Sequence, residues 1–470
     1  MATSTSTAVE RDLRALLGDS VVLPGNTRAY LTDATESRLL RGRADAVALP
    51  QDATSVAEVV RWCYEHDVPI VARGGGTGLA GGAVPVDGGV VLSLERLAAA
   101  PQIEPARWRA RVQAGVTTAT LARRAREEGL LFAPDPGAAE QSQIGGNIAT
   151  NAGGPHTFKY GVTGTWVSGL EVVLAPGELL SIGGTARKDV AGYDLRSLLI
   201  GSEGTLGIVT GAWIRLVPAP ELQLPVVAFY PSAGAGCEAL ATVLASGLQA
   251  AAIEYIDELA TTASLGAFPG TAPSQPAFAL ITEADGSESE ARRLQGELLE
   301  ALSPGSLATY APVQRAEIRE LWRWRAGVPL AAIAARGGKV SEDIVVPTER
   351  LAEAIAATLD IGERHGLPAC SWGHAGDGNV HATLLIDLDD PSELERAEAA
   401  GQDLFALAAS LGGAVSGEHG LGLVKRGALA LQWPERALEL HEQIKRLFDP
   451  KGLLNPGKKL ARPEPGGVGR

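Results

Sequence analysis

Along positions 45–220, segments in which apolar residues recur at helical spacing alternate with segments whose spacing is typical of strands. After Ser55 the apolar side chains recur at helical spacing, at Val56, Val59, Val60 and Cys63. Ser55 and Glu58 have the spacing of a capping box at the start of that helix. A second helix is predicted at 117–128. Strands are predicted where apolar runs are short or alternate with polar residues, at 69–72, 108–113, 169–174 and 207–217.

This pattern breaks at a group of prolines, Pro218, Pro220 and Pro225. A second α+β region follows, with helices predicted near 233–247, 287–302, 349–365 and 392–411. We therefore divide the chain into an N-terminal segment 1–40, a first domain 41–220, a second domain 221–443, a closing segment 444–460 and a tail 461–470. The tail is rich in proline and glycine, which predicts disorder.

The composition excludes several classes of protein. The 470 residues include 41 basic and 55 acidic side chains, and the net charge of −14 argues against nucleic acid as a partner. Cys63, Cys237 and Cys370 lie far apart without a CxxC pair, so no iron–sulfur or zinc-ribbon site is expected. Neither a signal peptide nor an apolar run of about 18 residues is found. These features predict a cytoplasmic protein.

The most informative motif is the loop at residues 73–82, RGGGTGLAGG, which follows an apolar run. Its glycines let backbone N–H groups approach an anion such as a diphosphate, and Arg73 adds positive charge. The spacing of Gly76, Gly78 and Gly81 fits GxGxxG, but the segment that contains Pro85 excludes the helix that a Rossmann motif needs. A P-loop needs lysine where Gly82 stands. The alternatives left open are a non-helical diphosphate cradle and a flexible loop without a ligand.

Two further glycine-rich clusters favour the first alternative. Residues 134–137 and 142–154 combine glycine with serine, asparagine and threonine, and residues 201–207 read GSEGTLG. Such segments suit a long ligand that lies along the backbone. They offer amide donors to flavin ring heteroatoms and ribityl hydroxyls.

Two short motifs in the second half hold three of the seven histidines: GHAGDGNVH at 373–381 and SGEHG at 416–420. Two imidazoles and a carboxylate are a common ligand set for a divalent transition metal with open positions. The other interpretation is that these are loop histidines with structural hydrogen bonds.

Taken together, these motifs resemble the FAD-linked oxidases typified by vanillyl-alcohol oxidase, and more narrowly their D-2-hydroxyacid dehydrogenase branch. That branch includes the flavin subunit of glycolate oxidase, D-lactate dehydrogenase and D-2-hydroxyglutarate dehydrogenase. The resemblance covers roughly residues 30–458, through the segments 73–82, 134–154, 159–161, 192–195, 201–207, 374–381, 417–420 and 449–457. It implies an α+β fold: a PCMH-type FAD-binding domain of two subdomains at 41–220, and a cap domain with a central antiparallel sheet at 221–443. The closing segment 444–460 would return to the FAD domain.

The resemblance also implies the cofactor site. The loop contains Thr77 and no histidine for a covalent flavin bond, so FAD is expected to bind noncovalently. The expected FAD-binding residues are Arg73, Gly74, Gly75, Gly76, Thr77, Gly78, Leu79, Pro134, Asp135, Pro136, Ser142, Gly145, Gly146, Asn147, Asn151, Gly204, Ile208 and Asn455.

For the reaction, the resemblance assigns a divalent metal to His374, His381 and Glu418, with zinc first and manganese or iron as alternatives. His419 would be the base that removes the proton of the substrate's 2-hydroxyl, with hydride transfer from C2 to flavin N5. A substrate carboxylate is bound best by a cation that donates two parallel hydrogen bonds to it. The segment Leu321–Arg325 contains two arginines, and the resemblance points to Arg325. Arg323 is about equally well explained as helix surface.

Departures from the family pattern narrow the substrate. Relatives that act on D-2-hydroxyglutarate carry Lys near Ser341 and Asn at the position of Thr383. We therefore expect a smaller substrate, glycolate or D-lactate. Three alternatives stay open: a D-2-hydroxyglutarate dehydrogenase, the flavin subunit of a multi-subunit glycolate oxidase, and an alkyl-dihydroxyacetone-phosphate synthase.

A non-catalytic flavin carrier is a more distant alternative. Because the chain has few cysteines, its electrons must pass to another molecule, a quinone, a cytochrome or an iron–sulfur subunit. A homodimer or a hetero-oligomer is expected, in the cytoplasm or at the membrane through a partner.

Overall fold

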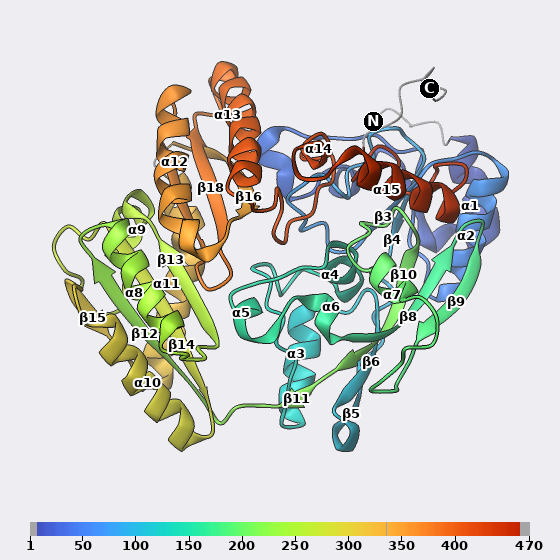
Figure 1. Ribbon diagram of the computed structural model, residues 1–470. Helices are drawn as coiled ribbons and strands as arrows, with labels where there is room; N and C mark the ends of the chain where they lie inside the picture. The colour runs from blue at the N-terminus through green and yellow to red at the C-terminus, as the bar shows by residue number, and fades with distance from the viewer. Residues whose placement is uncertain (1–6, 335, 461–470) are drawn as a thin grey trace.

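The computed structural model describes residues 7–334 and 336–460 and arranges them in two bodies (Figure 1). The first body contains two main sheets from the N-terminal half of the chain, and the second, the cap, is built on one larger sheet. Within the described residues no helix is long and apolar enough to cross a membrane. The predicted tail 461–470 lies outside these residues.

The first sheet is a small mixed sheet in the order β1-β2-β4-β3, in which only β1 runs antiparallel to its neighbour. Its strands are β1 (Val22–Pro24), β2 (Ala46–Ala48), β3 (Ile70–Arg73) and β4 (Val90–Ser93), and its helices are α1 (Ala8–Leu17) and α2 (Ala53–Glu65). β2 and the first three residues of β4 are continuous apolar runs because both faces of a parallel sheet are covered. β3 ends at Arg73, where the glycine loop begins.

The second sheet is antiparallel, in the order β5-β6-β10-β8-β9. Its strands are β5 (Gln102–Glu104), β6 (Arg109–Gln113), β8 (Val167–Leu174), β9 (Glu178–Gly183) and β10 (Ile208–Arg215), beside the short pair β7 (Leu130–Leu131) and β11 (Val217–Pro218). Its helices are α3 (Thr118–Glu127), α4 (Ile144–Thr150), α5 (Thr157–Tyr160), α6 (Thr163–Trp166) and α7 (Leu195–Leu199). Ile144 and Ile148 of α4 are buried in the core of this sheet, which fixes the glycines between them.

The cap sheet is antiparallel, in the order β15-β12-β14-β13-β17-β18-β16. Its strands are β12 (Leu222–Tyr230), β13 (Ala252–Ile256), β14 (Phe278–Gly286), β15 (Ala308–Tyr310), β16 (Gly338–Val345), β17 (Ala369–His374) and β18 (Asn379–Ile386). One face packs on α8 (Ala233–Ala245), α10 (Glu288–Leu302), α12 (Leu351–Arg364) and α13 (Pro391–Ser410). The other face packs on α9 (Glu258–Ser264) and α11 (Arg315–Ile333) and also carries the site residues.

The end of the chain returns to the first body. After α14 (Leu429–Gln432), helix α15 (Glu435–Phe448) places Ile444 and Phe448 against the antiparallel sheet's core (Figure 1). Leu454 then pairs with Ile70 of β3 and is fully buried. The first body is thus completed by residues from the far end of the sequence.

Most predicted elements are confirmed, with boundaries shifted by a few residues. The capping box at Ser55 is wrong: α2 begins earlier, and the side chain of Asp52 accepts the hydrogen bond from the Ser55 amide at 2.8 Å. Trp108 lies outside its predicted strand with a left-handed φ of 52°. Helix α11 had not been predicted, because its buried positions include Arg325 and its interior contains Pro329.

Candidate active site

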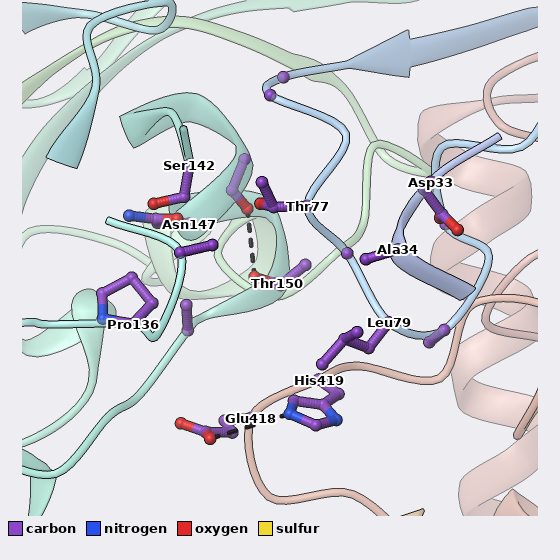
Figure 2. A pocket seen from close by; sticks show the side chains of 18 of the residues that line it. Asp33, Ala34, Thr77, Leu79, Pro136, Ser142, Asn147, Thr150, Glu418 and His419 are labelled. Atoms are coloured by element: carbon purple, nitrogen blue, oxygen red, sulfur yellow. Dashed lines mark hydrogen bonds and ion pairs between the residues drawn. The ribbon is translucent and has the colours of Figure 1, made fainter. Parts of the chain in front are cut away.

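A cavity of about 930 Å³ is lined by residues from both bodies (Figure 2). All of the predicted cofactor, metal and catalytic residues contribute to its lining except Pro134, Asn151 and Asn455. The lining includes all three glycine clusters together with His374, His381, Glu418, His419 and Arg325. The cavity therefore brings the glycine loops and the histidine motifs together.

The glycine loop after β3 lies against α4 and the segment before it, with no space for side chains at several points. A Cβ on Gly75 would lie 2.1 Å from the carbonyl oxygen of Gln141. A Cβ on Gly145 would lie 2.6 Å from that of Ala114. Gly76 has a left-handed φ of 70°. These glycines are required by close backbone approach, which leaves main-chain groups exposed to the cavity.

Arg73 lines the cavity as expected, but its guanidinium group is engaged by backbone carbonyl groups. Its guanidinium is buried and donates to the carbonyl oxygens of Thr32 (2.7 Å) and Ala29 (2.9 Å). Burial lowers its pKa, while the nearby Asp33 carboxylate opposes this effect. The side chain therefore joins the N-terminal segment to the glycine loop, and much of its hydrogen-bonding capacity is used there.

Asn455 lies behind the cavity wall. Its side-chain amide donates to the carbonyl oxygens of Gly82 (3.0 Å) and Glu203 (2.7 Å), so it joins two of the glycine loops. Asn151 has a comparable supporting role. Its side-chain oxygen accepts a hydrogen bond from the Gly164 amide at 2.8 Å, and Asn151 ends α4 with a left-handed φ of 54°. Both support the loops without lining the cavity.

The metal-ligand candidates converge at one end of the cavity. His374 ends β17, His381 lies in β18, and Glu418 lies in the loop 416–420. The Glu418 Oε1 atom lies 3.3 Å from His374 Nε2 and 3.5 Å from His381 Nε2. One donor atom from each of the three residues lies within 4.8 Å of the others.

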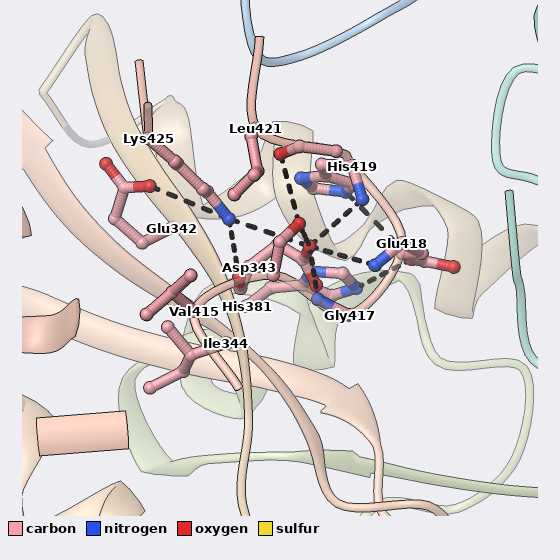
Figure 3. Close-up of polar contacts among 12 residues, drawn as sticks. Glu342, Asp343, Ile344, His381, Val415, Gly417, Glu418, His419, Leu421 and Lys425 are labelled. Atoms are coloured by element: carbon pink, nitrogen blue, oxygen red, sulfur yellow. Dashed lines mark hydrogen bonds and ion pairs between the residues drawn. The ribbon is translucent and has the colours of Figure 1, made fainter. Parts of the chain in front are cut away.

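These donors fit a divalent metal better than a second group, Asp343, His381 and His419, which also has close donor atoms. The second group is weaker because one oxygen of Asp343, Oδ2, already accepts the amides of Gly417, Glu418 and His419 at 2.8 to 3.0 Å (Figure 3). Its other oxygen accepts from Asn379 Nδ2 at 2.6 Å. In the first group, by contrast, Glu254 accepts a 2.5 Å hydrogen bond from His374 Nδ1, which leaves Nε2 for the ion.

Asp343 had not been predicted as part of the site. It is fully buried in β16, and its carboxylate fixes the backbone of the loop that carries Glu418 and His419. Burial alone would raise its pKa, but Lys425, His419 and His381 hold the pKa well below its usual range. No sequence motif indicates this role, which follows from the pairing of β16 with β18, where Asp343 lies opposite His381.

The histidines have different electrostatic surroundings. Burial and the adjacent His419 and His374 hold the pKa of His381 well below its usual value, which keeps it neutral. Burial also lowers the pKa of His419, although Asp343 and Glu418 act in the opposite direction. The rings of His381 and His419 are stacked with centroids 5.1 Å apart.

Arg325 extends from α11 and is buried beside these groups. Its Nη2 atom lies 2.6 Å from Glu254 Oε2, and its Nε has no hydrogen-bond partner among the described residues. Arg323, two residues earlier, is exposed and paired with Glu320, in agreement with the interpretation as helix surface. Glu254 thus contacts both Arg325 and His374, a connection that the sequence did not predict.

Comparison with known proteins defines the class. The family described as FAD linked oxidases, C-terminal domain, matches residues 219–459, and the FAD binding domain family matches residues 44–183. The chain therefore belongs to the FAD-linked oxidases and is a flavin-dependent oxidoreductase that acts on CH–OH groups.

Relatives within this family are more specific. The chain is 37% identical over 442 residues to glycolate oxidase subunit GlcD of Bacillus subtilis, with 92% of each chain covered. It is 35% identical over 440 residues to D-lactate dehydrogenase of Archaeoglobus fulgidus, covering 92% of this chain and 96% of the relative. The structure of p-cresol methylhydroxylase has the same fold, with a TM-score of 0.78, 19% identity and 96% of each chain covered. The predicted PCMH-type fold with an antiparallel cap sheet is confirmed.

Proposed function

We propose that this protein oxidises a D-2-hydroxyacid to the 2-oxoacid, with FAD as the first electron acceptor and a divalent metal at His374, His381 and Glu418. The observation that carries this proposal is the shared cavity, which these ligands, His419 and Arg325 line together with three glycine-rich segments. A bound flavin and a bound 2-hydroxyacid would meet between the two groups of residues.

The roles of the chain's own residues follow from this arrangement. The guanidinium of Arg325 binds the substrate carboxylate, and Glu254 holds the arginine in place through its 2.6 Å contact. The imidazole of His419 removes the hydroxyl proton. When bound, FAD supplies the two-electron oxidation at C2 and the metal supplies Lewis-acid polarisation of the hydroxyl. Asp343 keeps His419 and Glu418 in position through their backbone amides.

For the cofactor, we propose noncovalent FAD held by the predicted residues that line the cavity. Gly74 lies against Gly146 of α4, and Gly75 lies against the backbone of Gln141. This close backbone approach supports a diphosphate position near the loop. Thr77 lines the cavity and offers no nucleophilic nitrogen for a flavin bond. Asn151 and Asn455 would support the loops from behind.

For the substrate, the names of the relatives favour glycolate or D-lactate. Ser341 and Thr383 lie opposite each other on β16 and β18, and their hydroxyls share a 2.8 Å hydrogen bond. They contribute no charge to the cavity. The relative named as an oxidase subunit also supports a partner chain or other electron acceptor for the second half of the reaction.

Anaerobic mixing of the holoenzyme with glycolate, D-lactate, L-lactate and D-2-hydroxyglutarate tests this function. We expect bleaching of the flavin absorbance by a D-2-hydroxyacid and none by L-lactate. Treatment with a chelator should abolish the bleaching, and addition of Zn²⁺ or Mn²⁺ should restore it. Absence of bleaching by glycolate and by every D-2-hydroxyacid, with FAD and metal bound, would refute the proposal.

A further inference from the structure

The loop that carries Glu418 and His419 contacts both bodies, and we call its residues 416–425 the crossing loop. At its start, Asp343 of the cap accepts hydrogen bonds from three of its backbone amides (Figure 3). Further along, two more of its amides donate to the carboxylate of Glu203, which belongs to the first body. The segment with the proposed metal ligand and the proposed base is thus fixed by one carboxylate from each body.

Glu203 uses a separate oxygen atom for each of these two amides. Its Oε1 atom accepts from the Leu421 amide at 2.9 Å, and its Oε2 atom accepts from the Gly422 amide at 2.7 Å. The side chain is buried, and the ammonium group of Lys459 lies 3.3 Å from Oε1. Because hydrogen bonds to an ionised carboxylate are stronger than those between neutral groups, Glu203 is well suited to fix this part of the crossing loop.

The position of Glu203 is set by the glycine clusters. It belongs to the third cluster, 201–207, and lines the cavity. Its amide donates to the carbonyl oxygen of Ala149 in α4 at 2.7 Å, and its own carbonyl oxygen accepts from the Asn455 side chain. Its φ of 54° is left-handed, which is uncommon for a residue with a side chain and is kept where surrounding contacts require it. The segments proposed to bind FAD therefore place this carboxylate.

Two further contacts join the crossing loop to the other glycine clusters. The carbonyl oxygen of Ala80, in the loop 73–82, accepts from the Leu423 amide at 2.7 Å. Gly153, in the second cluster, lies so close to Glu418 that a Cβ there would be 2.6 Å from Oε2. The Oε1 atom of Glu418 lies 3.3 and 3.5 Å from the two histidine ligand candidates. One oxygen of this carboxylate thus faces a proposed FAD-binding segment, and the other faces the proposed metal site.

A ligand bound along the glycine clusters would restrict their movement, and the contacts above would pass this restriction to the crossing loop. We propose that Glu203 is a positioning residue that couples the two sites: FAD on the glycine clusters holds the crossing loop where Glu418 reaches the metal. This inference rests on the proposed function and adds to it that FAD favours metal binding. By thermodynamic linkage, the metal then raises the affinity for FAD by the same factor.

Titrations of the full-length, metal-free apoprotein measure this coupling without any substrate. The dissociation constant of Zn²⁺ is determined by competition with a chromophoric chelator, with and without saturating FAD. The dissociation constant of FAD is determined by flavin fluorescence, with and without saturating Zn²⁺. We expect FAD to tighten Zn²⁺ binding by about 10-fold or more, and the two ratios to agree. A change of this size leaves the FAD content of FAD-saturated protein unaltered, so the dissociation constants themselves are needed.

Glu203→Gln keeps the size of the side chain but offers one accepting oxygen to two amides. In this variant FAD should tighten Zn²⁺ binding by less than about 3-fold, while the Zn²⁺ affinity of the FAD-free protein should change little. A residue that only stabilised the fold would lower both Zn²⁺ affinities together and leave their ratio unchanged. Glu178→Gln, at an exposed acid of β9, is the matched control and should keep the wild-type ratio.

Gly420→Ala tests the same contact from the crossing loop and leaves Glu203 in place. Gly420 has a left-handed φ of 80°, and a Cβ there would lie 3.0 Å from the carboxyl carbon of Glu203. The added methyl group should move the crossing loop away from Glu203 and reduce the ratio as well. Because both changes break one contact, the double variant should lose little more coupling than either single variant. Each single variant tests the proposal on its own if the other is not recovered folded.

Three outcomes would overturn the coupling: a wild-type ratio near one, a wild-type ratio retained in the folded variants, or no Zn²⁺ binding with or without FAD. The first two leave the proposed reaction intact, because bleaching of the flavin by a 2-hydroxyacid tests it separately. The third would also remove the metal from the proposed function. If the ratio is large in the wild type and lost in Glu203→Gln, but neither glycolate nor any D-2-hydroxyacid bleaches the flavin, the coupling stands and the proposed reaction fails.

Discussion

Asp343 shows how one buried carboxylate positions residues that face the cavity. Three backbone amides, the Ser416 hydroxyl and the Asn379 amide all donate to it. An ionised carboxylate accepts at both oxygens, whereas an asparagine amide has only one accepting atom. Asp343 is therefore a positioning residue for Glu418 and His419.

For Asp343→Asn we expect kcat/KM to fall by about 10- to 100-fold. The NH2 group of the asparagine would face hydrogen-bond donors that now bind the carboxylate, and the loop 416–420 would be displaced. Metal content by mass spectrometry should fall in parallel, while FAD content should stay near that of the wild type. Asp360→Asn, an exposed acid on α12, is the control and should keep full activity. Normal activity and metal content in Asp343→Asn would contradict the positioning role.

The site residues differed in how far the sequence revealed them. His374, His381, Glu418 and His419 stand in short motifs, so their chemistry was visible from spacing and residue type. Glu254 and Asp343 stand in ordinary strand sequence. Their roles depend on which strands are neighbours. The pairing of β13 with β17 and of β16 with β18 joins segments that lie far apart in the sequence.

Among elements, the contact between the glycine loop and the segment leading into α4 is the most restrictive. Gly75 has no room for a methyl group, since a Cβ there would lie 2.1 Å from a backbone carbonyl oxygen that cannot move aside cheaply. The loop would have to shift away from α4, and the proposed diphosphate position lies between them. A single methyl group at Gly75 should therefore weaken FAD binding more than it slows substrate oxidation by the enzyme that has bound FAD.

Gly75→Ala is expected to raise the FAD dissociation constant by about 10-fold or more, a cost of roughly 1.4 kcal/mol. Flavin fluorescence during FAD titration of the apoprotein measures it. Gly184→Ala serves as the control, because a Cβ at Gly184 meets no atom within 4 Å and its φ is not left-handed. Equal affinities for the two variants would argue against a close-packed cofactor loop.

Helices and strands of the first body were largely predictable, since periodicity and turn residues act locally. The cap was harder. α11 combines buried Leu321, Trp324 and Val328 with a buried arginine and an internal proline, so its apolar stripe is interrupted. Strand β14 is buried along nearly its whole length and begins with four consecutive apolar residues, so it lacks the alternation of a half-exposed strand.

At the scale of the whole molecule, the two bodies are joined by an ionic contact at His156. Its Nδ1 atom lies 2.6 Å from Asp135 and its Nε2 atom 2.8 Å from Glu283 of the cap strand β14. Glu283 also accepts from Trp322 and Gln223. Burial by itself would lower the pKa of His156. The two carboxylates have the larger effect and hold this pKa well above its usual value. The protonated form therefore bridges the bodies.

This contact predicts a pH-dependent contribution to stability. The pKa of His156 is higher in the folded than in the unfolded chain, so its contribution is complete below about pH 6.5 and is lost as the pH rises through the folded pKa. His156→Gln should lower the stability by roughly 2 kcal/mol at pH 6. The difference in Tm from the wild type should shrink at alkaline pH. His66→Gln, at an exposed histidine, is the matched control and should change the Tm little. A difference that grows with pH would contradict the bridge.

The pairing of Leu454 with Ile70 has a consequence for biosynthesis. Leu453 and Leu454 belong to the core of the first body, and Asn455 joins two of its loops. A ribosome that has made residues 1–220 has therefore produced a body whose core still lacks its last side chains. Stable flavin uptake should wait until residues 444–455 have been made. A chain truncated after residue 443 should be recovered without FAD and should be cleaved rapidly by protease, although the segments that line the cavity are all still present.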